Sequence, residues 1–419
     1  MSMTAAEKIL SSHAGEEVRA GSFVEASVDL VLANDITGPL AIEIFREMGA
    51  ERVFDPDKVV LVPDHFVPNK DVRAAEQAKL LRQFAREQAI THYFEVGEMG
   101  IEHVLLPERG LVMPGQVIVG ADSHTCTYGA LGAFATGVGS TDVAAAMALG
   151  RLWFRVPETL RLEFRGTPSP AAGAKDLILH AIGEIGVEGA RYMALEFCGP
   201  AVEKLSVEGR LTMANMAVEA GAKVGLFAVD AKTREYLGKD VRGVETDPDA
   251  SFTTKVLDVA GLPPLVAAPH LPSNVRPAEE LRHVRVDQVY IGSCTNGRLE
   301  DLEAAASILK GHRVAPGVRV LVVPGSQAVY LAALRRGIIE VFLEAGAAVS
   351  TPTCGACLGG HMGVLAGGER CLATTNRNFV GRMGHESSEV YLAGPAVAAA
   401  TALTGYITDP REVVSYAAG

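Results

Sequence analysis

Short apolar runs recur along this chain, and most of them end at a cluster of polar residues and glycine. A run at 59–62 ends at Asp64-His65, and a run at 117–119 ends at Asp122-Ser123-His124. The stretches between such runs have helical composition. Short buried strands that alternate with helices are typical of α/β domains with parallel sheets, which is the fold class we expect.

The same alternation continues in the last third of the chain. The residues predict strands at 289–291, 318–323, 347–350 and 371–375, and one helix over 327–346. Two stretches rich in alanine and glycine, 130–150 and 392–407, predict buried helices. Because ligands bind beyond the carboxyl ends of parallel strands, the polar clusters that follow the strands predict one composite site.

Proline-rich joints divide the sequence. They lie at 156–170 and 262–274, and a chain of 419 residues is too long for one ordinary core. We therefore expect three α/β domains, at residues 1–157, 158–276 and 277–419.

Composition narrows the classes of function. The chain is 48% hydrophobic and 21% charged, and its formal net charge of −12 argues against non-specific binding of nucleic acid. The N-terminus lacks the basic segment and apolar core of a secretory signal, and 392–407 is too short to span a bilayer. We expect a cytoplasmic protein with no membrane partner and no nucleic-acid partner.

The cysteines point to a metal centre. Cys354 and Cys357 form a Cys-x-x-Cys pair, and Cys294 lies sixty residues upstream, also after a predicted strand. Three thiols suit a cubane with one iron that lacks a protein thiolate, whereas closed zinc sites and electron-transfer clusters want four ligands. On spacing alone, a zinc fragment beside a buried core thiol is equally consistent. Cys371 could be a fourth ligand, but its place in an apolar predicted strand favours a core thiol. Cys126 and Cys198 are assigned to packing.

Four segments carry a family resemblance. Gly292–Gly297, Cys354–Gly359, Asn376–Arg382 and Gly120–Thr125 resemble signature segments of the aconitase superfamily, in a match that runs from about residue 6 to 408. The length, with no further domain after residue 419, resembles the free-standing large subunits of the 3-isopropylmalate dehydratase and homoaconitase branch. The resemblance implies three aconitase-type domains around a central [4Fe-4S] cluster, one per chain.

The resemblance also implies roles for particular residues. The cluster ligands would be Cys294, Cys354 and Cys357. The catalytic groups would be Asp64, His65, His103, Asp122, His124 and Glu219. The substrate-binding groups would be Ser123, Asn215, Asn376, Arg377 and Arg382.

The chemistry of three of these roles suits the residue types. An imidazole oriented by Asp64 can protonate a departing hydroxyl, and a guanidinium matches a carboxylate with two parallel hydrogen bonds. Without the resemblance, Asp64-His65 reads as an ordinary loop, the arginines as surface ion pairs, and Asn215 with Glu219 as one face of a helical turn with a solvated acid.

By resemblance, the function is dehydration and rehydration of a small 2-hydroxy acid by a hydro-lyase. The segments Asp64–Lys70 and Phe94–Gly97 look closest to the leucine-biosynthesis enzymes, and homoaconitase of lysine biosynthesis stays open. Pro39 stands where aconitases have a substrate-binding glutamine, which weighs against citrate. A separate small subunit would carry the mobile domain. The alternative from a different functional class is an RNA-binding aconitase relative that lacks the cluster. The net negative charge argues against this alternative.

Overall fold

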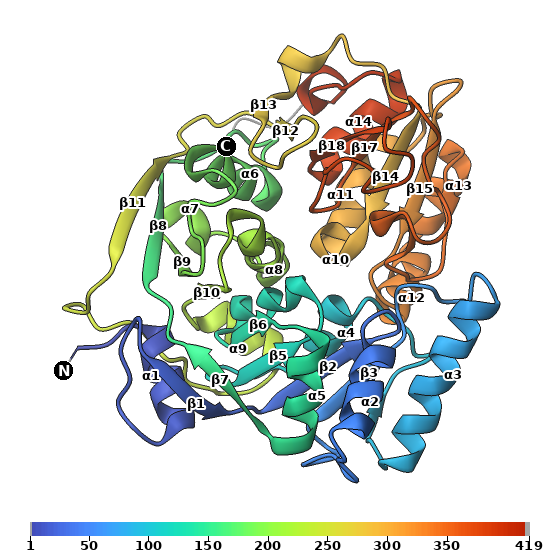
Figure 1. Ribbon diagram of the computed structural model, residues 1–419. Helices are drawn as coiled ribbons and strands as arrows, with labels where there is room; N and C mark the ends of the chain where they lie inside the picture. Colours follow the sequence, from blue (N-terminus) through green and yellow to red (C-terminus); the bar gives the residue numbers. More distant parts are fainter. Residues whose placement is uncertain (1, 415–419) are drawn as a thin grey trace. The chain divides into compact units, whose positions relative to one another are not determined.

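The computed structural model describes residues 2–414, which form two compact units. The first unit takes the residues up to Glu98, 106–164 and 190–257; the second takes 99–105, 165–189 and the residues from Asp258 on. The chain therefore passes between the units more than once, and Figure 1 traces its course from blue to red.

The first unit contains three sheets among the described residues. A parallel sheet in the order β4-β3-β2-β5-β6 comprises His92–Tyr93, Val59–Val62, Leu30–Asn34, Val117–Gly120 and Phe134–Gly137. A second, in the order β10-β9-β8-β11, comprises Val224–Phe227, Ala194–Cys198, Thr159–Arg165 and Thr253–Asp258. An antiparallel pair joins β1 (Phe23–Ser27) to β7 (Arg151–Arg155).

Helices surround these strands. The α-helices are α1 (Ala5–Ala14), α2 (Gly38–Glu47), α3 (Val72–Glu87), α5 (Ser140–Leu149), α7 (Pro200–Glu203), α8 (Val207–Asn215) and α9 (Ala231–Leu237), and the 3₁₀ helices are η1 (Ser123–Leu131) and η2 (Met216–Ala220). Helix α4 (Glu102–Glu108) begins in the second unit and ends in the first. Side-chain caps start several helices: the Asp71 carboxylate accepts from Ala74 N at 2.7 Å at the start of α3.

The second unit is built on a seven-stranded sheet in the order β13-β12-β18-β17-β14-β15-β16. Its strands are Val275–Pro277, Leu265–Ala267, Glu389–Ala393, Arg370–Ala373, Gln288–Gly292, Arg319–Val323 and Ala348–Val349. The five strands from β18 to β16 are parallel, and β12 runs antiparallel to both of its neighbours.

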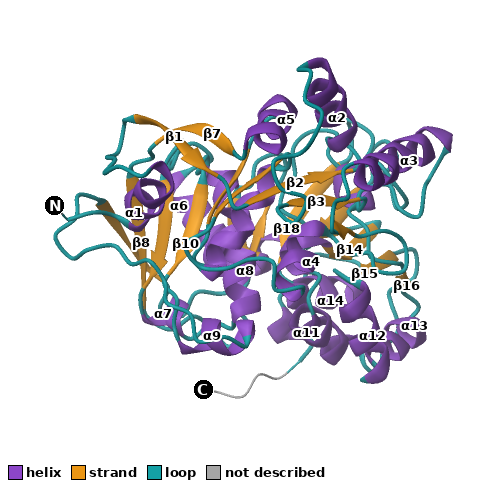
Figure 2. Cartoon of the chain, turned by 90° about the horizontal axis from the view of Figure 1, so that it is seen from below, coloured by secondary structure: helices purple, strands orange, loops and turns teal. Residues whose placement is uncertain are grey.

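The helices of this unit include four on one side of the sheet. These are α11 (Leu299–Leu309), α12 (Gln327–Arg335), α13 (Ile338–Ala345) and α14 (Pro395–Thr404), which lie together in Figure 2. The other helical segments are α6 (Ala174–Ile185), η3 (Ala278–Leu281), α10 (Ser293–Asn296), η4 (Gly355–Leu358) and η5 (Pro410–Glu412).

The apolar runs explain the strands. Every residue of β2, β3 and β14 is buried, as expected for parallel strands covered on both faces. The predicted strands at 59–62, 117–119, 289–291, 318–323 and 371–375 are confirmed within a residue or two, whereas the strand expected at 347–350 is limited to Ala348–Val349.

Two helix predictions were wrong in detail. The helix expected over 327–346 is two helices, because Gly337 adopts φ +73° and ends the first. The stretch 130–150 contains β6 as well as α5, since its small residues fit a closely packed strand as well as a helix. In 392–407 the helix is confirmed at Pro395–Thr404.

The three-domain division stays a prediction. The first expected boundary falls just before β8. The second falls within β13, and β12 precedes it, although both strands pair within the seven-stranded sheet. Within residues 2–414, no helix is both long and apolar enough to cross a membrane.

Candidate active site

The Asp35 side chain holds the loop that carries Asp64 and His65, the pair expected to act as the acid. Its carboxylate lies just after β2 and accepts three backbone hydrogen bonds from the loop after β3: from Asp64 N at 3.1 Å, His65 N at 2.9 Å and Phe66 N at 2.8 Å. Because β2 and β3 are parallel neighbours, both loops leave the same edge of the sheet. The buried carboxylate and the buried N–H groups satisfy one another.

Asp64 and His65 form a closed pair in this loop. Asp64 is fully buried, His65 is 7% exposed, and His65 Nδ1 lies 2.5 Å from Asp64 Oδ1. Burial disfavours the charged imidazole, but the Asp64 carboxylate, with Asp35 and Asp122 behind it, raises the pKa of His65 to about 10. A raised pKa favours the protonated imidazole, which is the form that can donate a proton.

A chain of polar side chains continues from His65 within the first unit. His65 Nε2 lies 3.8 Å from Asp122 Oδ2, and Asp122 Oδ1 accepts from the backbone of His124 at 2.8 Å. The His124 ring then meets Glu219 Oε1 at 2.8 Å. Five of the six predicted catalytic residues, all except His103, are thus linked in one series.

Glu219 is 4% exposed, so it is not a solvated acid. Helix α8 ends at Asn215, and Glu219 lies on the following 3₁₀ turn η2 rather than on one helical face with Asn215. Asn215 Nδ2 donates to Thr127 Oγ1 at 2.8 Å. Of the remaining predicted groups of this unit, Ser123 lines a cavity of about 530 Å³ that Lys223 also lines.

His103 belongs to the second unit. Its Nε2 lies 3.5 Å from Glu102 Oε1, and its carbonyl oxygen accepts a hydrogen bond from Arg298 at 3.2 Å. Glu102 is 1% exposed and His103 is 2% exposed, so both residues are buried. The composite site expected from all the strand-end clusters together stays a prediction.

The loop of Cys294 follows β14 through a strained backbone. Gly292 has φ +149°, and a Cβ there would lie 2.5 Å from the carbonyl oxygen of Val323. Ser293 has φ +86°, uncommon for a residue with a side chain. These two conformations turn the chain sharply at the strand end, so that Cys294 is buried at 3% exposure.

Asn376 links two of the expected ligands. Its Nδ2 donates to Cys294 Sγ at 3.3 Å, and its Oδ1 lies 3.9 Å from Cys357 Sγ. Arg382 Nη2 approaches Cys357 Sγ at 3.8 Å. Cys354 is one turn away, because its carbonyl oxygen accepts from Cys357 N at 3.0 Å. Amide and guanidinium donors beside sulfur stabilise thiolates.

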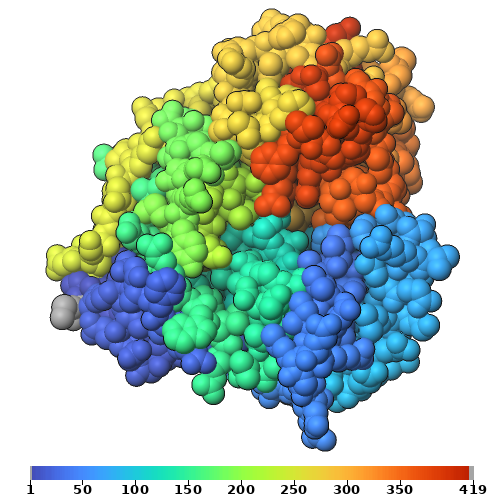
Figure 3. Space-filling model, in the orientation of Figure 1, coloured from blue at the N-terminus to red at the C-terminus, as the bar shows by residue number. Residues whose placement is uncertain are grey.

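Two exposed apolar residues lie between the expected carboxylate-binding arginines in sequence. Phe379 and Val380, which lie between Arg377 and Arg382 in sequence, are 41% and 62% exposed. Figure 3 shows the last third of the chain, orange to red, as a continuous part of the surface on the face drawn.

A buried hydroxyl group lies near the thiols. Tyr290 is fully buried in β14, and its hydroxyl has no hydrogen-bond partner among residues 2–414. Burial, followed by the charges of Cys357, Cys354, Cys294 and Cys371, raises the pKa of Tyr290 well above 10. A neutral donor is thus kept near the cysteines, and the described part of the chain gives it no acceptor. Three buried thiols, each free of a disulfide, and an unused donor fit a group with sulfur acceptors.

Three supporting residues were missed by the sequence reasoning. The sequence could have indicated Asp35, because an acid directly after a strand can reach the end of the next parallel strand. It gives no indication of Tyr290 or Lys175, because the first has the pattern of a strand residue and the second that of a helix residue.

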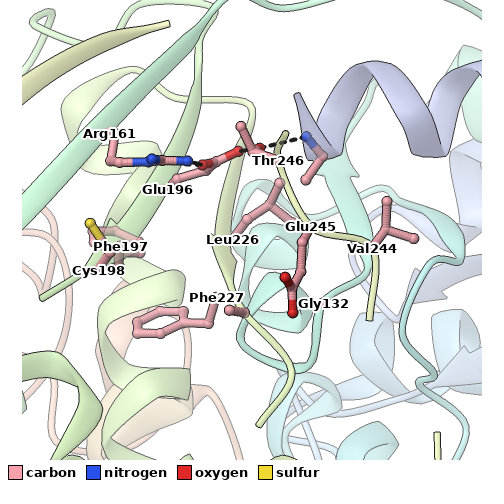
Figure 4. Close-up of a pocket in the computed structure, with 12 residues that line it drawn as sticks. Gly132, Arg161, Glu196, Phe197, Cys198, Leu226, Phe227, Val244, Glu245 and Thr246 are labelled. Atoms are coloured by element: carbon pink, nitrogen blue, oxygen red, sulfur yellow. Dashed lines mark hydrogen bonds and ion pairs between the residues drawn. The ribbon is translucent and has the colours of Figure 1, made fainter. Parts of the chain in front are cut away.

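A second cavity contains none of the predicted residues. It measures about 180 Å³ and lies beside β9 and β10. Figure 4 shows Arg161 paired with Glu196, which also accepts from Thr246. Arg161, Glu196 and Thr246 are hydrogen-bonded in series, and Phe197 stacks on Phe227 at 5.0 Å between ring centroids. Because none of the residues predicted for the site lines this cavity, it is not a candidate catalytic site.

Comparison with known proteins identifies the family. The sequence matches the Aconitase family (aconitate hydratase) over residues 7–279 and 266–405. The chain belongs to the aconitase family.

Full-length relatives and a solved structure agree with this assignment. The 3-isopropylmalate dehydratase large subunit of Moorella thermoacetica is 64% identical over 99% of this chain and 100% of its own length. The protein of the same name from Thermodesulfovibrio yellowstonii is 57% identical over the same shares. The crystal structure of Thermococcus kodakaraensis aconitase X superposes with a TM-score of 0.51 over 89% of each chain at 14% identity, which shows a shared fold.

The Asp35 loop gives a stability prediction. Asp35→Asn replaces one of two accepting oxygens with an NH₂ group that faces backbone N–H donors. We expect the free energy of unfolding to fall by about 1.5–3 kcal/mol, the range for hydrogen bonds to charged groups, as measured by urea denaturation. Asp55→Asn keeps an Oδ1 that can accept from Asp57 N in the exposed turn before β3, and should change it by about 0.5 kcal/mol or less. Equal effects of the two substitutions would contradict the structural role of Asp35.

Proposed function

We propose that this chain is the cytoplasmic large subunit of a 3-isopropylmalate dehydratase, a hydro-lyase that interconverts 2- and 3-isopropylmalate by dehydration and rehydration. The observation that carries the proposal is the buried Asp64–His65 pair, which keeps an imidazolium ready as an acid. Relatives that bear this name and match over their full length support the choice of substrate. They favour it over homocitrate-type acids.

The cofactor is part of the proposal. Cys294, Cys354 and Cys357 would hold one [4Fe-4S] cluster per chain, with one iron left without a protein thiolate. Such an iron supplies a Lewis acid that polarises the hydroxyl and carboxylate of the substrate. The burial of the three thiols, the amide of Asn376 between two of them and the unused Tyr290 hydroxyl support this assignment.

The chain's own residues would perform the acid step. His65 would give the proton on Nε2 to the departing hydroxyl, because Nδ1 is engaged with Asp64. Asp64 then faces an imidazole that has become neutral, and the pair is ready to take up a proton again. Asp122, His124 and Glu219 form the series that adjoins His65 and would orient the substrate and water around it.

Binding would fall to cationic and amide groups. Arg377 and Arg382 would hold the two carboxylates, since a guanidinium stays charged at every working pH. Ser123, Asn215 and Asn376 would accept or donate hydrogen bonds to the substrate, and His103, paired with Glu102, would complete the polar lining.

A separate small subunit is also proposed. Isomerisation requires removal of a proton from carbon, and no activated base for that step can be named among the groups above. The relatives are named large subunits, which supports a separate partner subunit. That partner would supply the base and recognise the isopropyl group. Exposed Phe379 and Val380, between the two arginines in sequence, offer apolar surface for it to cover.

An activity panel tests the function. The chain is reconstituted anaerobically with iron and sulfide and mixed with the small subunit of a close relative. Alkene formation is then followed by ultraviolet absorbance with 2-isopropylmalate, homocitrate or citrate as substrate.

 We expect turnover of 2-isopropylmalate at least about tenfold above that of the other two acids, a difference of about 1.4 kcal/mol in barrier. The large chain alone should not turn over. Preference for homocitrate, or full turnover without the partner, would overturn the corresponding part of the proposal.

The ligand assignment is tested by cysteine substitution. Cys294→Ser, Cys354→Ser and Cys357→Ser should each prevent assembly of the full cluster, because thiolates are the ligands. Cys371→Ser is the matched control, since Cys371 is also buried and burial raises the pKa of its thiol to about 12. The measurements are iron content and the visible absorption of the reconstituted chain. Full iron content in any one of the three serine variants would remove that cysteine from the ligand set.

The acid role is tested by pH dependence. With a pKa of about 10, His65 keeps its proton through neutral pH, and the acid step is lost only as the pH rises through that value. Asp64→Asn removes the strongest charge that raises this pKa, so the alkaline limb of the turnover profile should move to lower pH. Turnover at neutral pH should fall about 100-fold or more. Asp71→Asn, which changes only the cap of α3, should keep the wild-type profile. An unmoved alkaline limb in Asp64→Asn would assign the acid elsewhere.

A further inference from the structure

Lys175 is a buried cation that the proposed mechanism does not use. It lies in the first turn of α6 and is 1% exposed. Its ammonium donates to three acceptors: the carbonyl oxygens of Thr375 at 2.6 Å and Thr374 at 2.9 Å, and Asn296 Oδ1 at 3.2 Å. Three hydrogens therefore meet three acceptors, which is the arrangement that a fully buried ammonium needs.

The three acceptors belong to two different loops. Asn296 follows Cys294 by two residues in the loop after β14. Thr374 and Thr375 directly precede Asn376 in the loop after β17, and Asn376 donates to Cys294 Sγ. The ammonium thus ties the loop of one expected ligand to the loop of the amide that contacts it.

The neighbouring residue anchors Lys175 in place. The Asp176 carboxylate accepts from Gly173 N and from Leu265 N, both at 2.7 Å. These bonds hold the start of α6 against β12. Lys175 therefore projects from a helix end that has its own anchor, in addition to the loops that it contacts.

The surroundings of Lys175 are acidic. Burial lowers the pKa of its ammonium to about 7, while Asp301, Cys294, Cys357 and Asp176 act in the opposite direction. Asp301 is linked to the lysine through Asn296, whose Nδ2 donates to Asp301 Oδ1 at 2.9 Å. Arg298 is the other buried cation on this loop, and its side chain is engaged with the carbonyl oxygens of Thr295 and His103.

We propose that Lys175 is a positioning residue of the cluster site, which fixes the Cys294 loop against the Asn376 loop and places a positive charge behind the thiolates. The inference rests on the proposed cofactor. A cluster held by thiolates becomes more negative when it gains an electron, so a nearby cation favours the reduced form. The lysine should therefore affect both how long the cluster is retained and how readily it accepts an electron.

The experiment uses the anaerobically reconstituted chain with three substitutions. Lys175→Met removes the charge and all three hydrogen bonds, Lys175→Gln keeps an amide donor without charge, and Lys175→Arg keeps the charge. Lys232→Met is the matched control, because Lys232 also donates to two backbone carbonyls, of Glu203 and Leu205, in the other unit. Circular dichroism of the iron-free proteins checks that each variant folds.

Two measurements follow for each folded variant. The first is the rate at which a chelator removes iron, and the second is the equilibrium between oxidised and reduced cluster during titration with dithionite, read by electron paramagnetic resonance. For Lys175→Met we expect iron loss at least about tenfold faster. We also expect at least a tenfold shift of the equilibrium toward the oxidised form, which is about 59 mV for one electron. Lys175→Arg should restore the equilibrium to within about threefold of wild type, and Lys232→Met should change neither quantity.

The outcomes separate the inference from the proposed function. If the wild-type chain binds no iron, the cofactor itself is wrong. If the wild type binds a cluster and Lys175→Met matches it in both measurements, the inference alone is overturned. Should Lys175→Met fail to fold, Lys175→Gln decides: a shift toward the oxidised form supports the inference, and an unchanged equilibrium overturns it.

Discussion

The parallel pairing of β14 with β17 is the constraint on which the second unit's site depends. It places Gly292 and Thr374 at the same sheet edge, where the Thr374 hydroxyl contacts both the N–H and the carbonyl oxygen of Gly292 at 2.9 Å. The ladder is thereby extended beyond the strands. Because the Cys294 loop and the Asn376 loop both begin at this edge, their side chains meet across it, and Asn376 can reach the Cys294 sulfur.

The first unit uses the same geometry for a different purpose. Asp35 follows β2, Asp64 and His65 follow β3, and Asp122 follows β5, and these three strands are parallel neighbours. The result is an excess of carboxylates around one imidazole. Three backbone N–H groups satisfy Asp35, so that its charge is tolerated in the interior and adds to that of Asp64. The protonated state of His65 is thus a property of three strand ends together.

In this fold, function depends on the side chains at the carboxyl ends of the strands. A chain with 14% identity shares the architecture, which shows that the sheets tolerate wide substitution. Buried charges are less tolerant, because removal of one partner leaves the other uncompensated, at a cost of about 3–5 kcal/mol. The Asp64–His65 pair and Lys175 with its carbonyl acceptors are arrangements of this kind.

The sequence by itself determined the strand positions, because β3, β5, β14 and β15 are apolar runs that only a buried strand explains. It also predicted the cysteines and the Asp64–His65 pair as site residues, since their motifs are local. It did not determine where the long helix breaks at Gly337, or that Glu219 is buried against His124. Nor did it reveal Asp35 and Lys175 as supports. Lys175 acts on residues more than a hundred positions away, through backbone carbonyls that any residue possesses, and only the packing of α6 brings them within hydrogen-bond distance.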